Sequence, residues 1–276
     1  MNNTIEDLLV YGKSQCHKDH AKILLAELLH KNPLELLNCL NEIVDNETKE
    51  LYIKEIKALK EGKPLQYVIG NVNFYGNRFY IDERVLIPRF ETEELVENTI
   101  QYINQYFNKP VDIIDLGCGS GVIGLSLEKK VSTRTVDLID ISKDALEVAR
   151  INKDQFQSNV NLIESDFFQN IDNKYDVIIS NPPYISTKEE IEEIVKNNEP
   201  ELALYAGEKG LDCYEKIIKE LNNHMKYRCL VAFEIGMNQK NDIIDLINKY
   251  LQNVKIIIKK DLSERERMLF ILKNLE

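Results

Sequence analysis

The fold is decided by residues 111–124, which read VDIIDLGCGSGVIG. The first five residues predict a buried strand, a glycine-rich loop follows, and helix-forming residues continue to about Leu127. A strand, a tight loop and a helix in this order open the doubly wound α/β folds. Ligands of such folds bind at the carboxyl ends of the strands, so this loop is the first candidate site.

The alternation of strand and helix continues towards the end of the chain. Helices are predicted around residues 144–152 and 214–225. Further strands are predicted at residues 135–139, 161–163, 176–180, 229–235, 255–258 and 268–272. The last two strands have no helix between them and should pair antiparallel. We therefore predict a Rossmann-like, mostly parallel sheet with helices on both faces and an antiparallel last strand.

The beginning of the chain has a different pattern. Within residues 1–62, helical spacing of apolar residues predicts segments after Asp19, around Leu34–Leu40 and from about Glu47. Turn-forming glycine and asparagine among β-branched and aromatic residues then predict a β-hairpin. We expect three parts, namely a helical substrate-recognition domain over 1–73, a hairpin linker over 74–88 and a catalytic domain over 89–276.

The composition excludes several functional classes. The net charge is −11, which weighs against a surface that neutralises nucleic-acid phosphates. No run approaches the ~18 apolar residues that a membrane helix needs, and the first residues lack the pattern of a secretory signal. Five scattered cysteines without a C-x-x-C pair indicate a reduced, cytoplasmic protein and no structural zinc.

The glycine-rich loop leaves two cofactors to weigh. Residues 119–124 match G-x-G-x-x-G, and Asp140 ends the next strand where it could bind a ribose. An NAD-dependent oxidoreductase is therefore one alternative. Asp115 argues against it, because a carboxylate next to the loop would repel a pyrophosphate. S-adenosylmethionine has no phosphate and carries an ammonium and a sulfonium group, so we favour it.

A second candidate site follows the strand at residues 176–180. It is the tetrapeptide Asn181-Pro182-Pro183-Tyr184, in which two prolines fix φ and stiffen the loop. The side-chain oxygen of Asn181 and the carbonyl of Pro182 could accept the two hydrogens of a planar NH2 group, and Tyr184 offers a flat stacking face. The loop therefore predicts a site for an amino or amide group.

Together the two motifs resemble those of methyltransferases that act on amino groups with S-adenosylmethionine. The whole chain resembles the release-factor glutamine N5-methyltransferases, the HemK/PrmC type. The resemblance is carried by residues 64–70, 74–76, 85–93, 181–185, 199–200 and 234–236, with Phe79. Residues 86–93 are specific to this group. A nucleic-acid adenine-N6 methyltransferase shares residues 181–184 but should show a basic groove, and it stays as an alternative.

The resemblance implies roles for individual residues. It implies cofactor binding by Gly117, Cys118, Gly119, Ser120, Gly121, Asp140, Phe167 and Asn181. It implies that Asn181, Pro182, Pro183 and Tyr184 hold a target glutamine, with Asn181, Pro182 and Tyr184 in catalysis. The implied substrate is the Gly-Gly-Gln loop of class I peptide-chain release factors, methylated on the amide nitrogen without a metal. No direct contact with nucleic acid or membrane is expected.

Two residues depart from the pattern of that family. Phe90 stands where the family usually has a proline. Glu264 stands where the family commonly has a glycine, in a turn near the end of the chain. The conformation of that turn is therefore open, whereas the expected site does not involve it.

Overall fold

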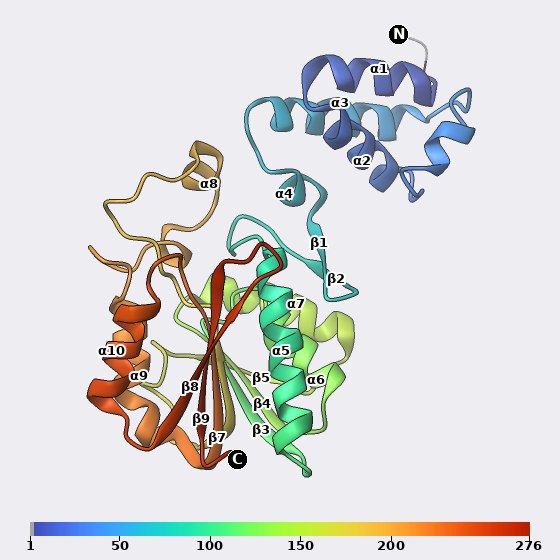
Figure 1. Cartoon of the computed structure of the whole chain (residues 1–276). Helices are drawn as coiled ribbons and strands as arrows, with labels where there is room; N and C mark the ends of the chain where they lie inside the picture. Colours follow the sequence, from blue (N-terminus) through green and yellow to red (C-terminus); the bar gives the residue numbers. More distant parts are fainter. Residues whose placement is uncertain (1–2) are drawn as a thin grey trace. The chain divides into compact units, whose positions relative to one another are not determined.

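The structure is a computed structural model that describes residues 3–276, which form two compact units (Figure 1). The first unit extends to Asn71 and also includes Glu192–Asn198. The second unit comprises Val72–Ile191 and Glu199–Glu276, so the hairpin that we expected as a linker is counted with it. No sequence pattern indicated that a segment near residue 195 would group with the beginning of the chain.

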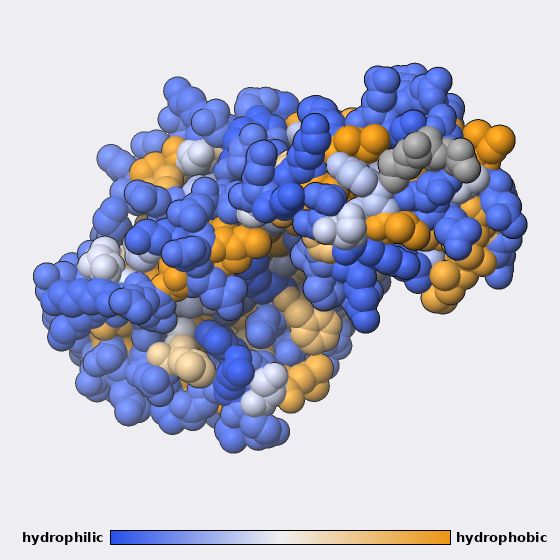
Figure 2. All heavy atoms as spheres, turned by 90° about the horizontal axis from the view of Figure 1, so that it is seen from above, coloured by the Kyte–Doolittle hydropathy of each residue, from blue (hydrophilic) through white to orange (hydrophobic). Residues whose placement is uncertain are grey.

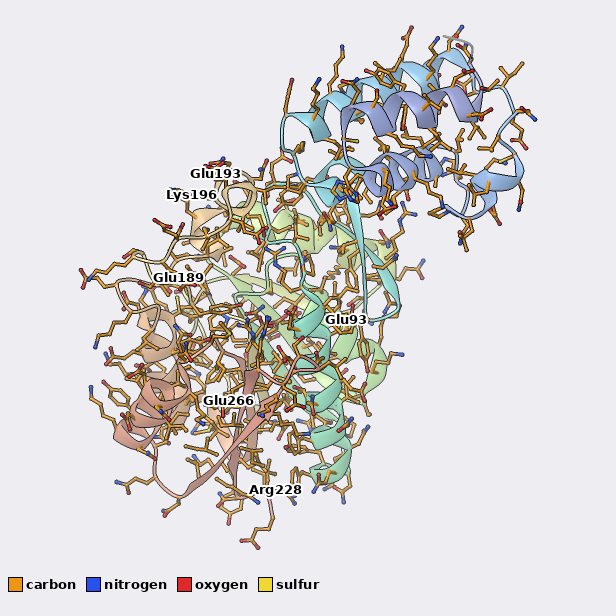
Figure 3. The ribbon with its side chains drawn as sticks, turned by 45° about the horizontal axis from the view of Figure 1, so that its top comes forward. Glu93, Glu189, Glu193, Lys196, Arg228 and Glu266 are labelled. Atoms are coloured by element: carbon orange, nitrogen blue, oxygen red, sulfur yellow. The ribbon has the colours of Figure 1, made fainter. Side chains whose placement is uncertain are left out.

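The first unit is helical. Its helices are α1 (Ile5–Gln15), α2 (Lys18–Leu28), the 3-10 turn η1 (Glu35–Asn38), α3 (Asn46–Lys60), α4 (Leu65–Ile69) and α8 (Glu193–Asn198). Tyr52 of α3 lies in its core, and the Tyr52 hydroxyl donates to the carbonyl of Ala21 at 3.1 Å. A side chain at Gly12 of α1 would collide with that hydroxyl. On α8, Glu193 and Lys196 are exposed (Figure 3).

Two details of the first unit differ from the sequence prediction. α1 was not among the predicted segments, although Thr4 and Asp7 form a capping box at its start. The segment around residues 34–40 is a single 3-10 turn rather than a helix. Only Leu36 of its apolar residues is fully buried, while Leu34 and Leu37 are exposed, so the segment lacks the continuous apolar face that stabilises a longer helix.

The second unit contains a seven-stranded sheet in the order β5-β4-β3-β6-β7-β9-β8. The strands are β3 (Val111–Leu116), β4 (Thr133–Asp140), β5 (Asn161–Glu164), β6 (Tyr175–Ser180), β7 (Met225–Glu234), β8 (Val254–Lys260) and β9 (Glu266–Lys273). Neighbouring strands are parallel, except that β9 is antiparallel to β7 and β8. All seven predicted strands are present, and the predicted doubly wound fold is confirmed. A separate hairpin consists of β1 (Asn71–Phe74) and β2 (Asn77–Tyr80), so it begins before the predicted linker of 74–88 and ends well within it.

Helices cover both faces of the sheet (Figure 1). One face packs against α5 (Phe90–Tyr106), α6 (Val122–Lys130) and α7 (Lys143–Phe156), and the other against α9 (Asp212–His224) and α10 (Lys240–Tyr250). The short 3-10 turn η2 spans Glu201–Ala203. α10 was not predicted. Its Lys240 forms an ion pair of 2.7 Å with Glu266 at the start of β9. No helix in the described part of the chain is long and apolar enough to cross a membrane.

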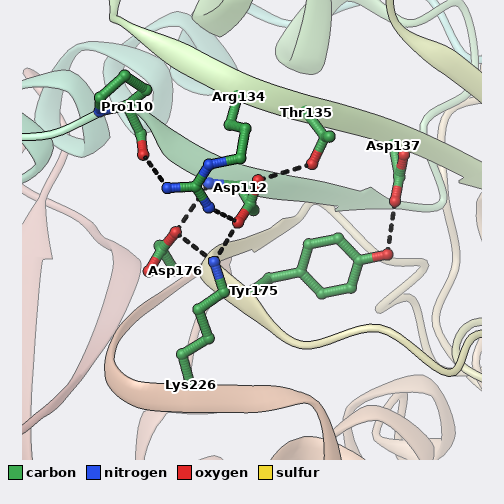
Figure 4. A network of polar contacts seen from close by, with 8 residues as sticks. All are labelled: Pro110, Asp112, Arg134, Thr135, Asp137, Tyr175, Asp176 and Lys226. Atoms are coloured by element: carbon green, nitrogen blue, oxygen red, sulfur yellow. Dashed lines mark hydrogen bonds and ion pairs between the residues drawn. The ribbon is translucent and has the colours of Figure 1, made fainter.

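A charged network joins the amino ends of four neighbouring strands (Figure 4). Lys226 of β7 binds the carboxylates of Asp112 on β3 and Asp176 on β6, the latter at 2.7 Å. Arg134 of β4 also binds Asp112. Burial tends to raise the pKa of Asp112, but Lys226, Thr135 and Arg134 outweigh it and hold the pKa below its ordinary value. The network therefore fixes the edge of the sheet opposite the carboxyl ends.

Replacing the central cation of this network should destabilise the fold. We expect Lys226→Met to lower the free energy of unfolding at pH 7 by about 1–3 kcal/mol, because it leaves two partly buried carboxylates with fewer partners. Urea denaturation measures the change. Lys143→Met removes a lysine from an exposed ion pair of 3.5 Å with Glu164 and should change stability by less than about 0.5 kcal/mol. Equal effects of the two variants would contradict the structural role of Lys226.

Candidate active site

A cavity of about 450 Å³ opens at the carboxyl ends of the parallel strands, a volume typical of small-molecule sites. β3 lies between β4 and β6. The strands that follow β3 in the chain are added on one side of it as far as β5, and from β6 onward they are added on its other side. Such a reversal of strand order is where doubly wound sheets bind their ligands. The lining includes Arg84, Leu86, Gly117, Gly119, Asp140, Ser142, Asp166, Phe167, Asn181, Pro183, Pro200, Leu202, Ala203 and Lys216.

The loop after β3 needs its glycines. Gly117, Gly119 and Gly121 have φ of +72°, +53° and +80°, values that residues with a side chain rarely adopt. A side chain at Gly121 would also press on Leu125 and Leu138 at 3.2 Å. Among the loop residues expected to bind cofactor, Gly117 and Gly119 line the cavity. Cys118, Ser120 and Gly121 are buried outside its lining and instead support the turn.

Asp140 fixes the loop to the neighbouring strand. One oxygen of its carboxylate accepts the N–H of Gly119 and the other accepts the N–H of Ser142, both at 2.9 Å. Burial raises the pKa of Asp140, against these backbone hydrogen bonds, which lower it. Asp140 lines the cavity, and a carboxylate has lone pairs to spare for further donors. It can therefore bind hydroxyl groups without moving. Phe167, with φ of +51°, adds an aromatic ring to the same cavity.

The prediction that Asp115 faces the ligand is wrong. Its carboxylate is fully buried and is not part of the cavity lining. One oxygen accepts the N–H of Gly124 at 3.0 Å, and the other has no partner among residues 3–276. Burial raises the pKa of Asp115 to about 7. Asp115 therefore stabilises the junction of loop and α6, and it gives no direct contact that would select one cofactor over another.

The residues after β6 divide between the cavity and the protein interior. Asn181 and Pro183 line the cavity, whereas Pro182 and Tyr184 do not. The Nδ2 of Asn181 donates to the hydroxyl oxygen of Thr92 at 3.2 Å. The Tyr184 hydroxyl donates to the carboxylate of Glu234 at 3.3 Å. Burial is the main reason that the pKa of Tyr184 lies above its ordinary value, so its hydroxyl remains a proton donor.

A buried carboxylate that was assigned no role from the sequence holds another wall of the cavity. Glu199 accepts the N–H of Ile87 at 3.1 Å and the guanidinium of Arg89 at 2.6 Å, and its side chain is only 2% exposed. Residues 200–203, which directly follow Glu199, contribute Pro200, Leu202 and Ala203 to the lining. The only sequence signal for Glu199 was that residues 85–93 and 199–200 both belong to the motifs quoted above.

Within residues 3–276, no group of three or more histidine, cysteine, aspartate or glutamate side chains is placed to hold a metal ion. The cavity instead combines a fixed carboxylate, an aromatic ring, glycine backbone and a side-chain amide. Such a set suits an organic ligand with hydroxyl groups and a flat ring system.

The chain matches two protein-family models and several known methyltransferases. A model of the PrmC N-terminal domain matches residues 14–70, and one of the methyltransferase small domain matches residues 92–203. The chain is 34% identical to the release factor glutamine methyltransferase of Bacillus anthracis, over 90% of each chain. It is 37% identical to that of Streptococcus pneumoniae, over 86% of this chain and 85% of the relative.

Solved structures agree at the level of the fold alone. A methyltransferase from Pyrococcus furiosus is 18% identical, with a TM-score of 0.55 over 84% of this chain and 100% of that one. The 16S rRNA N2 G1207 methyltransferase of T. thermophilus, solved with AdoMet and guanosine, is 12% identical. Its TM-score is 0.53 over 74% of this chain and 50% of that one.

The raised pKa of Asp115 should make stability depend on pH. Between about pH 4 and 7 the folded chain holds a proton there that the unfolded chain, with an ordinary pKa of about 3.9, has released. This contribution is fully present below that ordinary value and is lost as the pH rises towards about 7. Asp115→Asn cannot ionise, so its free energy of unfolding should decrease less than that of the parent between about pH 4 and 7.

Urea denaturation at a series of pH values measures this dependence. Asp242→Asn replaces an exposed aspartate at the start of α10 and should follow the parent. If Asp115→Asn follows the parent as well, the buried carboxyl group does not titrate as described.

Proposed function

Because the chain belongs to the family of release factor glutamine methyltransferases, we propose that it methylates the side-chain amide nitrogen of a glutamine in a peptide-chain release factor. S-adenosylmethionine is the proposed methyl donor. The observation that carries the proposal is that Asn181 and Pro183 line the same cavity as Gly117, Gly119 and Asp140. The cavity thus combines a loop suited to an NH2 group with a carboxylate suited to a ribose. Methyl transfer between two bound molecules requires that both bind in one place.

The lining residues fit S-adenosylmethionine better than a dinucleotide. The Asp140 carboxylate is fixed for ribose hydroxyl groups, and the Phe167 ring offers a flat apolar face for adenine. The two cationic side chains in the lining are already paired, Arg84 with Asp82 at 2.6 Å and Lys216 with Asp166 at 2.8 Å. A pyrophosphate would therefore find little free positive charge, and a ligand without phosphate is favoured.

The proposed reaction depends on hydrogen-bond acceptors that the protein supplies. Bound S-adenosylmethionine supplies an electrophilic methyl group. An amide nitrogen is a poor nucleophile because its lone pair is delocalised into the carbonyl group. We propose that the side-chain oxygen of Asn181, which lines the cavity, accepts one of its N–H groups and holds the nitrogen in line with the methyl group. The carbonyl of Pro182, a residue outside the cavity lining, is the proposed acceptor of the other N–H group. These hydrogen bonds strengthen as the nitrogen becomes positive, so they stabilise the transition state more than the ground state.

We also propose that the helical unit recognises the release factor. It carries several exposed apolar side chains, including Leu34 at 70% exposure and Ile43 at 82%. Figure 2 shows apolar patches of this kind on a surface that is mostly hydrophilic. Exposed apolar patches on an otherwise polar surface often mark sites of protein interaction. An enzyme acting on release factors would work in the cytoplasm.

Removing the proposed acceptor should impair turnover more than cofactor binding. We expect Asn181→Ala to lower kcat by about 10²–10³-fold, while the Kd for S-adenosylmethionine changes much less, since the loop and Asp140 remain. Transfer of labelled methyl groups to purified release factor measures kcat, and calorimetry measures Kd. A release factor whose target glutamine is replaced by glutamate offers no N–H donors and should accept no methyl group. Near-normal turnover of Asn181→Ala would contradict the proposed role.

Introducing charges on the exposed apolar surface of the helical unit should weaken recognition of the release factor without affecting cofactor binding. We expect Leu34→Glu combined with Ile43→Glu to raise the KM for release factor by about tenfold and to leave the Kd for S-adenosylmethionine unchanged. Tyr227→Glu changes a residue of 80% exposure near the amino ends of the strands, away from the cavity, and should leave both constants unchanged. An unchanged KM in the double variant would show that this surface does not contact the substrate.

A further inference from the structure

We infer that Glu234, acting through the hydroxyl group of Thr92, sets which end of the Asn181 amide faces the target nitrogen. The inference deepens the proposed function and rests on it for the identity of the target. Glu234 and Thr92 are positioning residues in this account, because neither lines the cavity. They determine whether Asn181 presents its oxygen or its nitrogen.

The three side chains come from three different elements. Asn181 follows β6, Thr92 lies in the first turn of α5, and Glu234 is the last residue of β7. The hydroxyl of Thr92 donates to one carboxylate oxygen of Glu234 at 2.6 Å. The Nδ2 of Asn181 donates to the oxygen of that hydroxyl at 3.2 Å. Thr92 and Glu234 are 3% and 2% exposed, so water does not compete with these hydrogen bonds.

The number of hydrogens available determines which group donates in each of these hydrogen bonds. A hydroxyl group has one hydrogen, and a distance of 2.6 Å is typical of an O–H group bound to an ionised carboxylate. When Glu234 is ionised it can only accept, so Thr92 donates its one hydrogen to Glu234 and the Thr92 oxygen can only accept from Asn181. The nitrogen end of the amide must therefore face Thr92, and the oxygen end must face away from it.

The direction matters because the two ends of an amide have almost the same shape. Among residues 3–276, the one hydrogen bond of the Asn181 side chain is the bond from its nitrogen to Thr92, so its oxygen remains available to a ligand. If the amide turned by 180°, its NH2 group would meet the N–H groups of the target, and donor would oppose donor. The acceptor that the proposed reaction needs exists only in the orientation that Thr92 imposes.

The carboxylate of Glu234 also holds Tyr184, at the other end of the Asn181–Tyr184 loop. Its second oxygen accepts the hydroxyl of Tyr184 at 3.3 Å, so one buried group positions both Asn181 and Tyr184. The guanidinium of Arg267 on β9 lies near enough to favour the charged form of Glu234, and Glu91 on α5 opposes it. Burial has the largest effect and raises the pKa of Glu234, against Thr92, Arg267 and Tyr184.

The first test separates the hydroxyl group from the shape of the side chain. We expect Thr92→Val, which keeps the shape and removes the hydroxyl, to lower kcat by about 10²-fold, the usual effect of misplacing a group by a small distance. The KM for S-adenosylmethionine should change by less than about twofold. Thr92→Ser keeps the hydroxyl and should retain most of kcat.

A matched control is available on the same helix. Thr99 is fully buried in α5, and its hydroxyl donates to the carbonyl of Leu95 at 2.7 Å, within the helix itself. Thr99→Val should therefore keep the parent kcat. Loss of activity in Thr99→Val equal to that in Thr92→Val, or parent activity in Thr92→Val, would overturn the inference.

The second test reverses the direction of the hydrogen bonds and needs no substrate. Asn181→Asp at pH 8 places a carboxylate against the Thr92 oxygen, whose hydrogen is on Glu234, so the midpoint of thermal unfolding should fall. In a Glu234→Gln background, the new NH2 group can donate to Thr92, which frees the Thr92 hydrogen for the carboxylate introduced by Asn181→Asp. The loss caused by Asn181→Asp should then be smaller by roughly 3 °C or more.

The two tests distinguish failure of the inference from failure of the proposed function. If the parent protein methylates no release factor, the proposed function fails, while the midpoints of unfolding still report on the hydrogen bonds. If the parent methylates release factor but Asn181→Asp lowers the midpoint equally in both backgrounds, the hydrogen bonds have no fixed direction and the inference fails.

Discussion

The connections between the parallel strands constrain everything else in the second unit. The crossover from one parallel strand to the next is right-handed, so the chain moves to opposite faces of the sheet on the two sides of β3. No helix can then cover the carboxyl ends of β3 and β6, and a crevice remains there. The glycine-rich loop and Asn181 directly follow β3 and β6, and Asp140 is the last residue of the neighbouring β4. Their proximity is a consequence of the strand order.

The features that the sequence predicted well are those with a local cause. The strand, loop and helix of residues 111–124 were recognisable because burial pattern and turn chemistry lie in adjacent residues. α1 is an exception, since it was missed although Ile5, Leu8 and Leu9 have helical spacing and Thr4 and Asp7 form a capping box at its start. Asp115 was also misplaced. The pattern shows that a carboxylate precedes the loop, but only the structure shows that the loop covers it.

The side chains that support the site could not be found by reading along the chain. Thr92 and Glu234 are 142 residues apart, Thr92 and Asn181 are 89 apart, and Arg89 and Glu199 are 110 apart. No spacing rule connects residues so distant. Their segments were quoted as family motifs, which marked them as informative without indicating a role. The structure adds the physical reason, since each segment contributes a hydrogen-bond partner that another segment lacks.

The grouping of α8 with the helical unit affects how these proteins can evolve. The chain leaves the first unit after Asn71, returns to it at Glu192 and leaves it again after Asn198. A single recombination event at the first boundary would therefore transfer an incomplete helical unit and leave α8 behind in the other gene product. Exchange of substrate recognition between relatives requires two coordinated replacements, one of them only a few residues along the chain from the Asn181–Tyr184 loop. Inheritance of the two units as a pair is the simpler outcome.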